Sequence, residues 1–271
     1  MAFISSVFLR PHQFPFKEIN MKHPYKNFNL FKLFIFTIAF VFSSITLAKS
    51  HNHKPSTIKI SKNSIVAIHL LDLKDGKNSA FQLHYYPLLK KAIKKSGGNL
   101  EAKFDTYQIA EGKLRPHYII MTEWPSVAAF EAYLRTSQIE PYATAQRNIT
   151  RHSEFSLYTI DNDISFRPNN SSAYEFWFLS YSSPQSPDLM YQSYIKVLPS
   201  MTSYGRELLI DLKPLNHPQS NHKRDLAGLS IWPSPSHFYK FITEDLVAEA
   251  FKVYRDPAVR DIEIINTQFV E

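Results

Sequence analysis

Histidine and carboxylate side chains stand among apolar residues in three segments that alternate in the two-residue rhythm of β-strands. His69 lies in the run IVAIHLL, Glu123 lies near the end of HYIIMTEW, and His152 lies near the start of TRHSEFSLYTI. Side chains at alternate positions of a strand share one face of a sheet. If the uniformly apolar faces receive helices, these three residues and Tyr107 of a neighbouring strand meet on the other face.

Such a meeting would support two kinds of chemistry. A histidine beside a carboxylate in an apolar cavity can act as a general base with an orienting partner, while Tyr107 or Arg147 holds an oxygen of the ligand. His69, His152 and Glu123 also form a ligand set that suits zinc or non-haem iron. The simpler alternative gives each histidine a structural or surface position, and Glu123 an ion pair at the sheet end.

Composition excludes several other classes of function. The chain has 271 residues, 44% of them hydrophobic, and no cysteine, so it can bury sizeable cores but has no disulfide or thiolate metal site. The formal charge of +7 depends largely on the first 48 residues, which carry five Lys or Arg and one Glu. No nucleic-acid partner is expected, because the remaining excess is small. The chain has only six glycines, and they do not form a glycine-rich loop of the kind that binds phosphate groups. No cofactor is therefore expected.

A segment of the chain recurs about a hundred residues later. The stretch PHYIIMTEWPSVAAFEAYL, from Pro116, matches RDLAGLSIWPSPSHFYKFI, from Arg224, and aligns Trp124 with Trp232. Each copy reads as a strand, a Trp-Pro-Ser corner and the start of a helix. Such a repeat indicates an internal duplication. Trp124, beside Glu123, is also a candidate ligand contact.

The two halves have the same predicted order of elements, β-α-β-β-α-β. In the first half we expect strands over 65–71, 100–109, 116–124 and 150–160 and helices over 81–96, 127–135 and 139–148. In the second half we expect strands over 174–181, 206–212, 226–232 and 259–270 and helices over 187–204, 236–245 and 246–254. The predicted fold class is α+β, with two ferredoxin-like repeats, 63–161 and 173–271, whose antiparallel sheets pack face to face. The stretches 49–62 and 162–172 are predicted linkers.

The first repeat resembles a known group of proteins through YYPLLKKAIKKSGG, FDTYQIAEGK, HYIIMTEWPSVAAFEAYL and YATAQR. It is similar to an uncharacterised domain-of-unknown-function family of the dimeric α/β-barrel superfamily, with a divergent second copy in tandem. The resemblance implies an intrachain dimeric α/β-barrel. Relatives in that superfamily include cofactor-free monooxygenases, haem-degrading enzymes and muconolactone isomerase, so the resemblance does not select an activity.

The beginning of the chain has the order of a secretory signal. Lys22, Lys26 and Lys32 precede the apolar run LFIFTIAFVF and the segment SSITLA, which predicts a signal peptide over 21–48, cleavage after Ala48 and a periplasmic or secreted protein without a membrane span. Residues 1–20 are then a gene-model extension. The alternative is an uncleaved membrane anchor, although the apolar run is short for one.

A mature N-terminus at Lys49 would make His51 the third residue of the chain. The free amine, two backbone nitrogens and the His51 imidazole could then bind Cu(II) or Ni(II) in a square plane. The alternative is that this stretch is only a polar, mobile linker.

Two classes of function remain open from the sequence. The leading hypothesis is a non-catalytic protein that binds a small hydrophobic molecule or a protein partner, as a monomeric pseudo-dimer or a homodimer. The alternative is a cofactor-independent oxidoreductase or isomerase with its pocket in the first repeat, where His69, Tyr107, Glu123 and His152 would be catalytic. A surface-interaction protein is a third possibility, which an exposed aromatic patch on the second repeat would favour.

Overall fold

The computed structural model describes residues 57–137, 140–218, 220 and 224–270. Its first repeat follows the predicted order, with a short helical turn and a π-helical turn leading into the first long helix. The elements are β2 (Ile65–Leu73), α1 (Asn78–Ala80), η1 (Phe81–Tyr85), α2 (Tyr86–Lys95), β3 (Asn99–Glu111), β4 (Tyr118–Trp124), α3 (Val127–Ser137), α4 (Tyr142–Ile149) and β5 (Thr150–Thr159).

The second repeat has the same order with a more broken final helix. Its elements are β7 (Ala173–Tyr181), α5 (Ser186–Ser203), β8 (Glu207–Pro214), β9 (Leu226–Trp232), α6 (Pro235–Ile242), α7 (Asp245–Ala250), η2 (Phe251–Arg255), α8 (Asp256–Ala258) and β10 (Val259–Phe269). Strands β2 and β7 are equally long and begin 108 residues apart, at Ile65 and Ala173. The same offset relates β4 to β9. It therefore defines which residues of the two repeats correspond.

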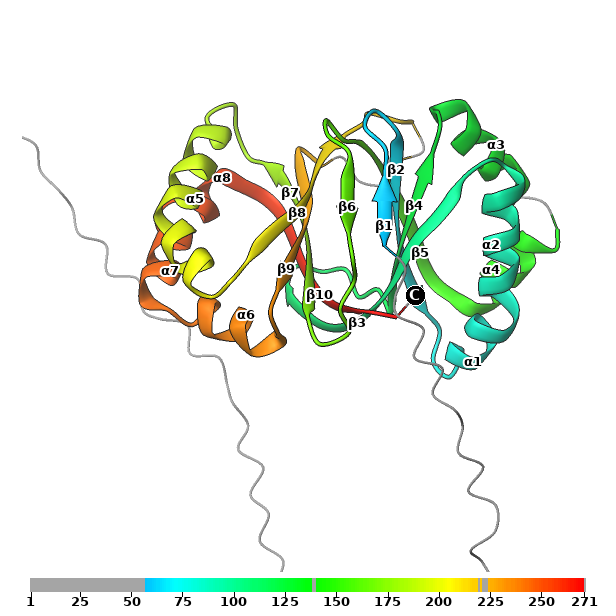
Figure 1. The fold of residues 1–271 in the computed structure, drawn as a ribbon, viewed down its shortest axis with the longest axis horizontal. Coiled ribbons are helices and arrows are strands. Elements are labelled where there is room, and N and C mark those ends of the chain that lie inside the picture. Colours follow the sequence, from blue (N-terminus) through cyan, green and yellow to red (C-terminus); the bar gives the residue numbers. More distant parts are fainter. Residues whose placement is uncertain (1–56, 138–139, 219, 221–223, 271) are drawn as a thin grey trace, which may run out of the picture. The chain divides into compact units, whose positions relative to one another are not determined.

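Strands of both repeats close into one barrel in the order β10-β3-β4-β2-β5-β8-β9-β7. Helices of the first repeat lie outside one half of the barrel and helices of the second repeat outside the other half (Figure 1). The two seams between the repeats differ. Strands β3 and β10 pair over six residue pairs, whereas β5 and β8 pair only through Tyr158–Pro214 and Thr159–Lys213. The predicted fold class, two ferredoxin-like repeats forming an intrachain α/β-barrel, is confirmed.

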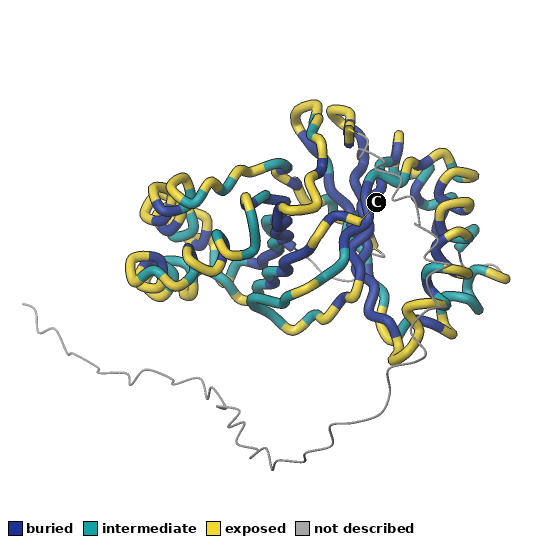
Figure 2. Tube along the Cα trace, turned by 60° about the horizontal axis from the view of Figure 1, so that its bottom comes forward, coloured by how far each residue is buried: buried dark blue, intermediate teal, exposed yellow. Residues whose placement is uncertain are grey.

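The barrel interior is filled with apolar side chains. Val66, Ile68 and Leu70 of β2 contribute to this core together with Phe104 and Phe176, and burial is concentrated along the strands (Figure 2). The uniformly apolar face of β2 therefore points into the barrel, and the prediction that it receives the helices is wrong. The physical reason is closure: the interior of a barrel of eight strands is just wide enough for side chains to fill it.

Two short strands lie within the predicted linkers. Strand β1 (Ile58–Ile60) pairs antiparallel with β6 (Ile164–Phe166), and Ile58 and Ile60 join the barrel core. The linkers thus form a ribbon that packs on the barrel. Among the described residues, no helix combines the length and hydropathy needed to cross a bilayer.

Candidate functional site

The four residues predicted to meet inside the barrel do not meet. His69 is on the helix-facing side of β2, where the rings of Phe130, Tyr133 and Phe155 lie 5.9–6.2 Å from its own. Burial lowers the pKa of His69 to about 4, so the imidazole is neutral at neutral pH. Its Nε2 has no hydrogen-bond partner within the described part of the chain. The surroundings of His69 are those of a core residue of the first repeat.

Glu123 and Tyr107 lie at different places on the sheet. Glu123 accepts a hydrogen bond of 2.7 Å from the backbone N–H of Ser61 and so fixes the end of the β1 segment. Tyr107 is the extra residue of a β-bulge, because the pairing of β3 with β10 passes from Thr106 directly to Gln108. Burial and the nearby Tyr239 and Glu175 raise the pKa of its hydroxyl. Tyr107 therefore lies close to residues of the second repeat.

The remaining candidates are also dispersed. The His152 ring is half exposed, and its Nε2 lies 3.1 Å from Oε2 of Glu154. Arg147 is exposed and pairs with Glu140 at 2.8 Å. The Trp124 indole is fully buried and donates a hydrogen bond of 2.8 Å to Thr122 Oγ1. His51 lies outside the described residues.

The prediction of a shared interior pocket is therefore wrong for two reasons. His69 lies on the face of β2 that points away from the barrel interior, and Glu123 and His152 pair with opposite ends of β2, at Val66 and Asp72. Within the described ranges, no group of three or more His, Asp or Glu side chains is arranged to hold a metal ion. The first repeat consequently has neither of the two predicted constellations.

A cavity of about 500 Å³ lies in the second repeat, between the sheet and the helices α5 and η2. Its floor comes from Trp177, Leu179 and other residues of the sheet, and its walls from α5 and Phe251. The lining contains five aromatic side chains, which are Trp177, Tyr181, Tyr191, Tyr194 and Phe251. No histidine or cysteine is among the described residues that line it, so the usual axial haem ligands of those two types are lacking. Its size and apolar lining are those of a site for a small organic molecule.

The cavity exists because the inward face of α5 carries small side chains. Ser193, Val197 and Ser200 are buried there. The corresponding positions of the first repeat, 108 residues earlier, hold Tyr85, Leu89 and Ala92, which fill the space under η1 and α2. Replacing Tyr by Ser and Leu by Val removes the atoms that would occupy the volume.

The sheet beneath the cavity has changed in a matching way. Trp177 corresponds to His69, and Gly228 corresponds to Ile120. A Cβ at Gly228 would overlap the Trp177 indole, so the glycine allows the ring to lie close to strand β9. The Trp177 Nε1 donates a hydrogen bond of 3.2 Å to Ser230 Oγ. The indole is thus held in a defined position on the cavity floor.

Two arginines border the cavity, and each faces a carboxylate. Arg206 Nε donates to Glu175 Oε2 at 3.3 Å. Arg255 Nη1 lies 2.9 Å from Glu111 Oε2, and its guanidinium stacks over the Phe251 ring at 4.0 Å. Burial, as the main cause, raises the pKa of Glu111, opposed by the Arg255 charge. The apolar volume is therefore bordered by paired charges.

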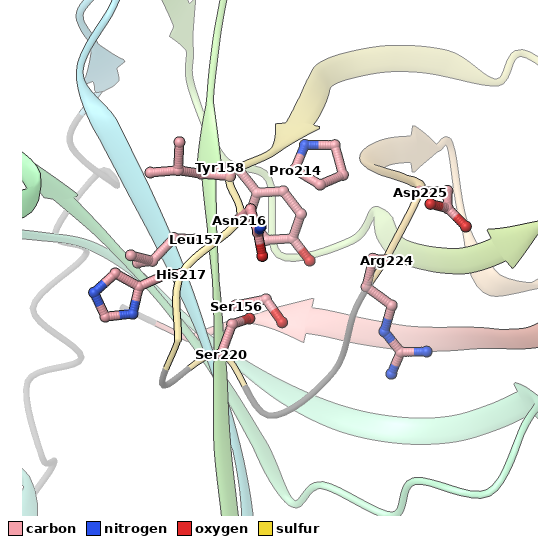
Figure 3. Close-up of a pocket in the computed structure, with 10 residues that line it drawn as sticks. Ser156, Leu157, Tyr158, Pro214, Asn216, His217, Ser220, Arg224 and Asp225 are labelled. Carbon is pink, nitrogen blue, oxygen red and sulfur yellow. The ribbon is translucent and has the colours of Figure 1, made fainter.

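A second cavity, of about 290 Å³, opens where β5 and β8 barely pair (Figure 3). Ser156 and Tyr158 of β5 line it on one side and His217 and Arg224 on the other. The buried Arg224 guanidinium is 3.9 Å from the buried Glu154 carboxylate. This cavity is smaller and more polar than the α5 cavity.

The aromatic residues of the second repeat divide between the barrel core and the α5 cavity. Tyr174, Phe176 and Phe178 belong to the barrel core, but Trp177 and Tyr181 line the α5 cavity. Helix α5 also exposes a stripe of apolar side chains, Tyr191, Tyr194, Ile195 and Leu198. The signal that could have located the cavity is the pair Ser193 and Val197 at inward helical positions, where the first repeat has the larger Tyr85 and Leu89.

Neither the protein-family models nor the curated proteins compared with the sequence give a match. Similar folds do occur among solved structures. An anthrone oxidase-like protein superimposes with a TM-score of 0.54 at 12% identity, over 80% of this chain and 95% of that one. A haem-binding protein from Thermus thermophilus gives 0.43 at 11% identity, over 80% and 94% of the two chains. A mutant chlorite dismutase from Candidatus Nitrospira defluvii gives 0.47 at 6% identity, over 78% and 93%. At such identities the likeness concerns architecture, and the chain has the dimeric α/β-barrel fold within a single polypeptide.

Proposed function

We propose that the protein binds a small, flat, apolar molecule in the α5 cavity. The observation that carries this proposal is an apolar volume of about 500 Å³ walled by five aromatic side chains. Aromatic rings favour flat partners, because offset and edge-to-face contacts between rings add to the free energy of burial. The barrel interior, by contrast, is occupied by a continuous cluster of buried apolar side chains, which supports the choice of the α5 cavity.

The fold neighbour with the TM-score of 0.54 supports the same class of ligand. It is described as an anthrone oxidase-like protein, and anthrone is a flat tricyclic ketone. An oxidoreductase or isomerase acting on such a molecule is the alternative function. Its reacting groups would then be those that border the α5 cavity, Glu175 and Arg206, in place of the dispersed His69 and His152.

Binding is tested with naphthalene and anthrone as flat aromatic ligands. A ligand that binds only the folded state raises its stability, by about 2.7 kcal/mol at a hundredfold excess over Kd. Both compounds should raise Tm and quench Trp177 fluorescence. Ser193→Phe, which fills the cavity, should abolish both effects, while Ser203→Phe, on the exposed side of α5, should retain them. Equal responses in the two variants would contradict the proposed site.

The enzymatic alternative has a separate readout. Consumption of anthrone in air, followed by absorbance, should be faster with the protein than without it. The acceleration should disappear in Ser193→Phe if it occurs in the α5 cavity. Binding without any consumption would leave the binding function and remove the enzymatic one.

We also propose that the chain is exported and folds as the two repeats 63–161 and 173–271. The order of basic, apolar and small residues over 21–48 supports a cleaved signal peptide. Mass spectrometry of the protein from the periplasm should give a mature N-terminus at Lys49. Only that terminus would allow His51 to bind Cu(II), so any other start removes the metal proposal. Light scattering of the mature protein should distinguish a monomeric pseudo-dimer from a homodimer.

A further inference from the structure

One end of the α5 cavity contains a buried ion pair. The side chains of Arg206 and Glu175 are 11% and 8% exposed, and Arg206 Nε lies 3.3 Å from Glu175 Oε2. The same oxygen also accepts a hydrogen bond of 2.6 Å from Trp232 Nε1. The carboxylate is therefore fixed by two donors that both act on one of its oxygens.

The first repeat has no such pair at the corresponding positions. Ala67 corresponds to Glu175, and Gly98 corresponds to Arg206. The indole of Trp124, which corresponds to Trp232, donates instead to Thr122. Burying two charges costs desolvation free energy that their attraction often fails to recover, so such a pair is weak evidence for a role in stability. Its position beside a cavity favours a role in binding.

Both members of the pair have hydrogen-bonding capacity left over. A guanidinium carries five N–H donors. Beyond Nε, Arg206 makes one weak contact, from Nη1 to the Met201 sulfur at 3.4 Å. Within the described part of the chain, Nη2 of Arg206 and Oε1 of Glu175 have no hydrogen-bond partner. A donor and an acceptor that belong to one ion pair thus remain available at the end of an apolar cavity.

Charge decides which polar group suits this end. The charges of Arg206 and Glu175 cancel, and Arg255, the other arginine of the lining, is engaged by Glu111 and Asp256. Asp211, the remaining charged residue of the lining, is exposed and would repel an anion as well. The charge of an anionic ligand would therefore be buried without a free counter-charge, which is costly. An uncharged group with a donor next to an acceptor satisfies both free positions.

We infer that the ligand of the α5 cavity is an uncharged aromatic molecule bearing a paired donor and acceptor, of which a primary carboxamide is the simplest example. Its carbonyl oxygen accepts from Arg206 Nη2, its N–H donates to Glu175 Oε1, and its ring lies against Trp177. This inference rests on the proposed function, because it specifies the ligand of the same cavity.

The test uses three compounds with one ring system: naphthalene, naphthalene-2-carboxamide and 2-naphthoate. Their dissociation constants are measured by titration calorimetry on the complete mature protein. The carboxamide should bind about tenfold more tightly than naphthalene, the ratio expected when about 1.4 kcal/mol of net hydrogen bonding is added. 2-Naphthoate should bind more weakly than the carboxamide, because its charge is uncompensated.

Glu175→Gln provides the decisive variant. It keeps the shape of the side chain but leaves the Arg206 charge unpaired, so the preference should reverse and 2-naphthoate should bind more tightly than the carboxamide. Glu207→Gln, at an exposed position of β8, should keep the original order. A purely structural role of Glu175 would weaken all three compounds alike. Arg206→Lys is the second variant, should Glu175→Gln not fold: it should reduce carboxamide affinity towards that of naphthalene, whose own affinity should stay unchanged.

The outcomes separate the two proposals. If none of the three compounds binds the wild-type protein, the proposed function itself is wrong. If naphthalene binds as tightly as the carboxamide, the polar end does not recognise a ligand and only the present inference fails. The same conclusion follows if the variant at position 175 leaves the order of affinities unchanged.

Discussion

Filling the α5 cavity from the helix side should stabilise the protein. Ser193 is buried on the inward face of α5, at the position that Tyr85 occupies in the filled first repeat. Phe is larger than Ser by roughly 100 Å³, and a cavity in a protein core costs about 24 cal/mol per Å³, so complete filling would contribute at most about 2.4 kcal/mol. The loss of conformational entropy of the Phe side chain reduces this gain in stability by about 0.5 kcal/mol or more. We expect Ser193→Phe to raise the free energy of unfolding by about 1–2 kcal/mol, or Tm by about 2–8 °C for a domain of this size.

The reverse substitution in the first repeat is the matched control. Tyr85→Ser empties a position that is now packed, and truncation of a large buried aromatic residue typically costs about 3–5 kcal/mol. Urea denaturation monitored by circular dichroism gives both values on the same scale. If Ser193→Phe destabilises the protein as strongly as Tyr85→Ser does, the space under α5 is already occupied by side chains, and the comparison between the repeats is refuted.

Three further predictions concern the sheet and the contacts between the repeats. Gly228→Ala should lower the free energy of unfolding by about 1–3 kcal/mol, because the new Cβ overlaps the Trp177 ring. In the double variant with Trp177→His, urea denaturation should show a smaller decrease. Glu263→Gln should lower the free energy of unfolding by about 2 kcal/mol, because the buried Glu263 carboxylate accepts hydrogen bonds from two backbone N–H groups of the β3–β4 turn. An unchanged midpoint of urea denaturation would show that other contacts hold the turn. Burial, followed by the charge of a neighbouring carboxylate, raises the pKa of Glu101 from 4.5 to about 7, so its contribution to stability is complete below pH 4.5 and is lost as the pH rises through 7. Glu101→Gln should therefore raise stability at pH 8.5 by about 1 kcal/mol, a value discounted for partial exposure, and have little effect at pH 4. Thermal unfolding at the two pH values measures the difference, and equal effects at both would contradict the raised pKa.

Much of the architecture could be predicted because the local signals agree with the final structure. The strand expected over 226–232 has those same bounds, and Gly97 and Gly205 end the long helices of the two repeats with positive φ angles, as glycines after a helix commonly do. Strands β1 and β6 could not be predicted in the same way. Each has only three residues, and its stability comes from Ile58 and Ile60 packing on a barrel formed by distant segments.

The candidate site was misplaced for a different reason. A period of two shows that His69 and Ala67 share a face, but it does not show whether that face meets helices or the partner sheet. The deciding condition is closure of the barrel, which requires the uniformly apolar face of β2 to point inwards. Position 69 then falls among the rings of Phe130 and Tyr133, where it can be only a buried, neutral core residue.

The two Trp-Pro-Ser corners show how the site arises from a shared scaffold. Trp124 and Trp232 are both fully buried, so each anchors its corner in the same way. Their N–H groups differ in partner: Trp124 donates to Thr122 of its own strand, whereas Trp232 donates to Glu175 on the cavity side of β7. In the first repeat, the Thr122 hydroxyl accepts the hydrogen bond of the indole and leaves no group that faces a ligand. In the second repeat, Glu175 accepts the indole hydrogen bond with Oε2, so its Oε1 stays available. The corner is therefore scaffold in both repeats, and only in the second does it also orient a carboxylate towards an open apolar volume.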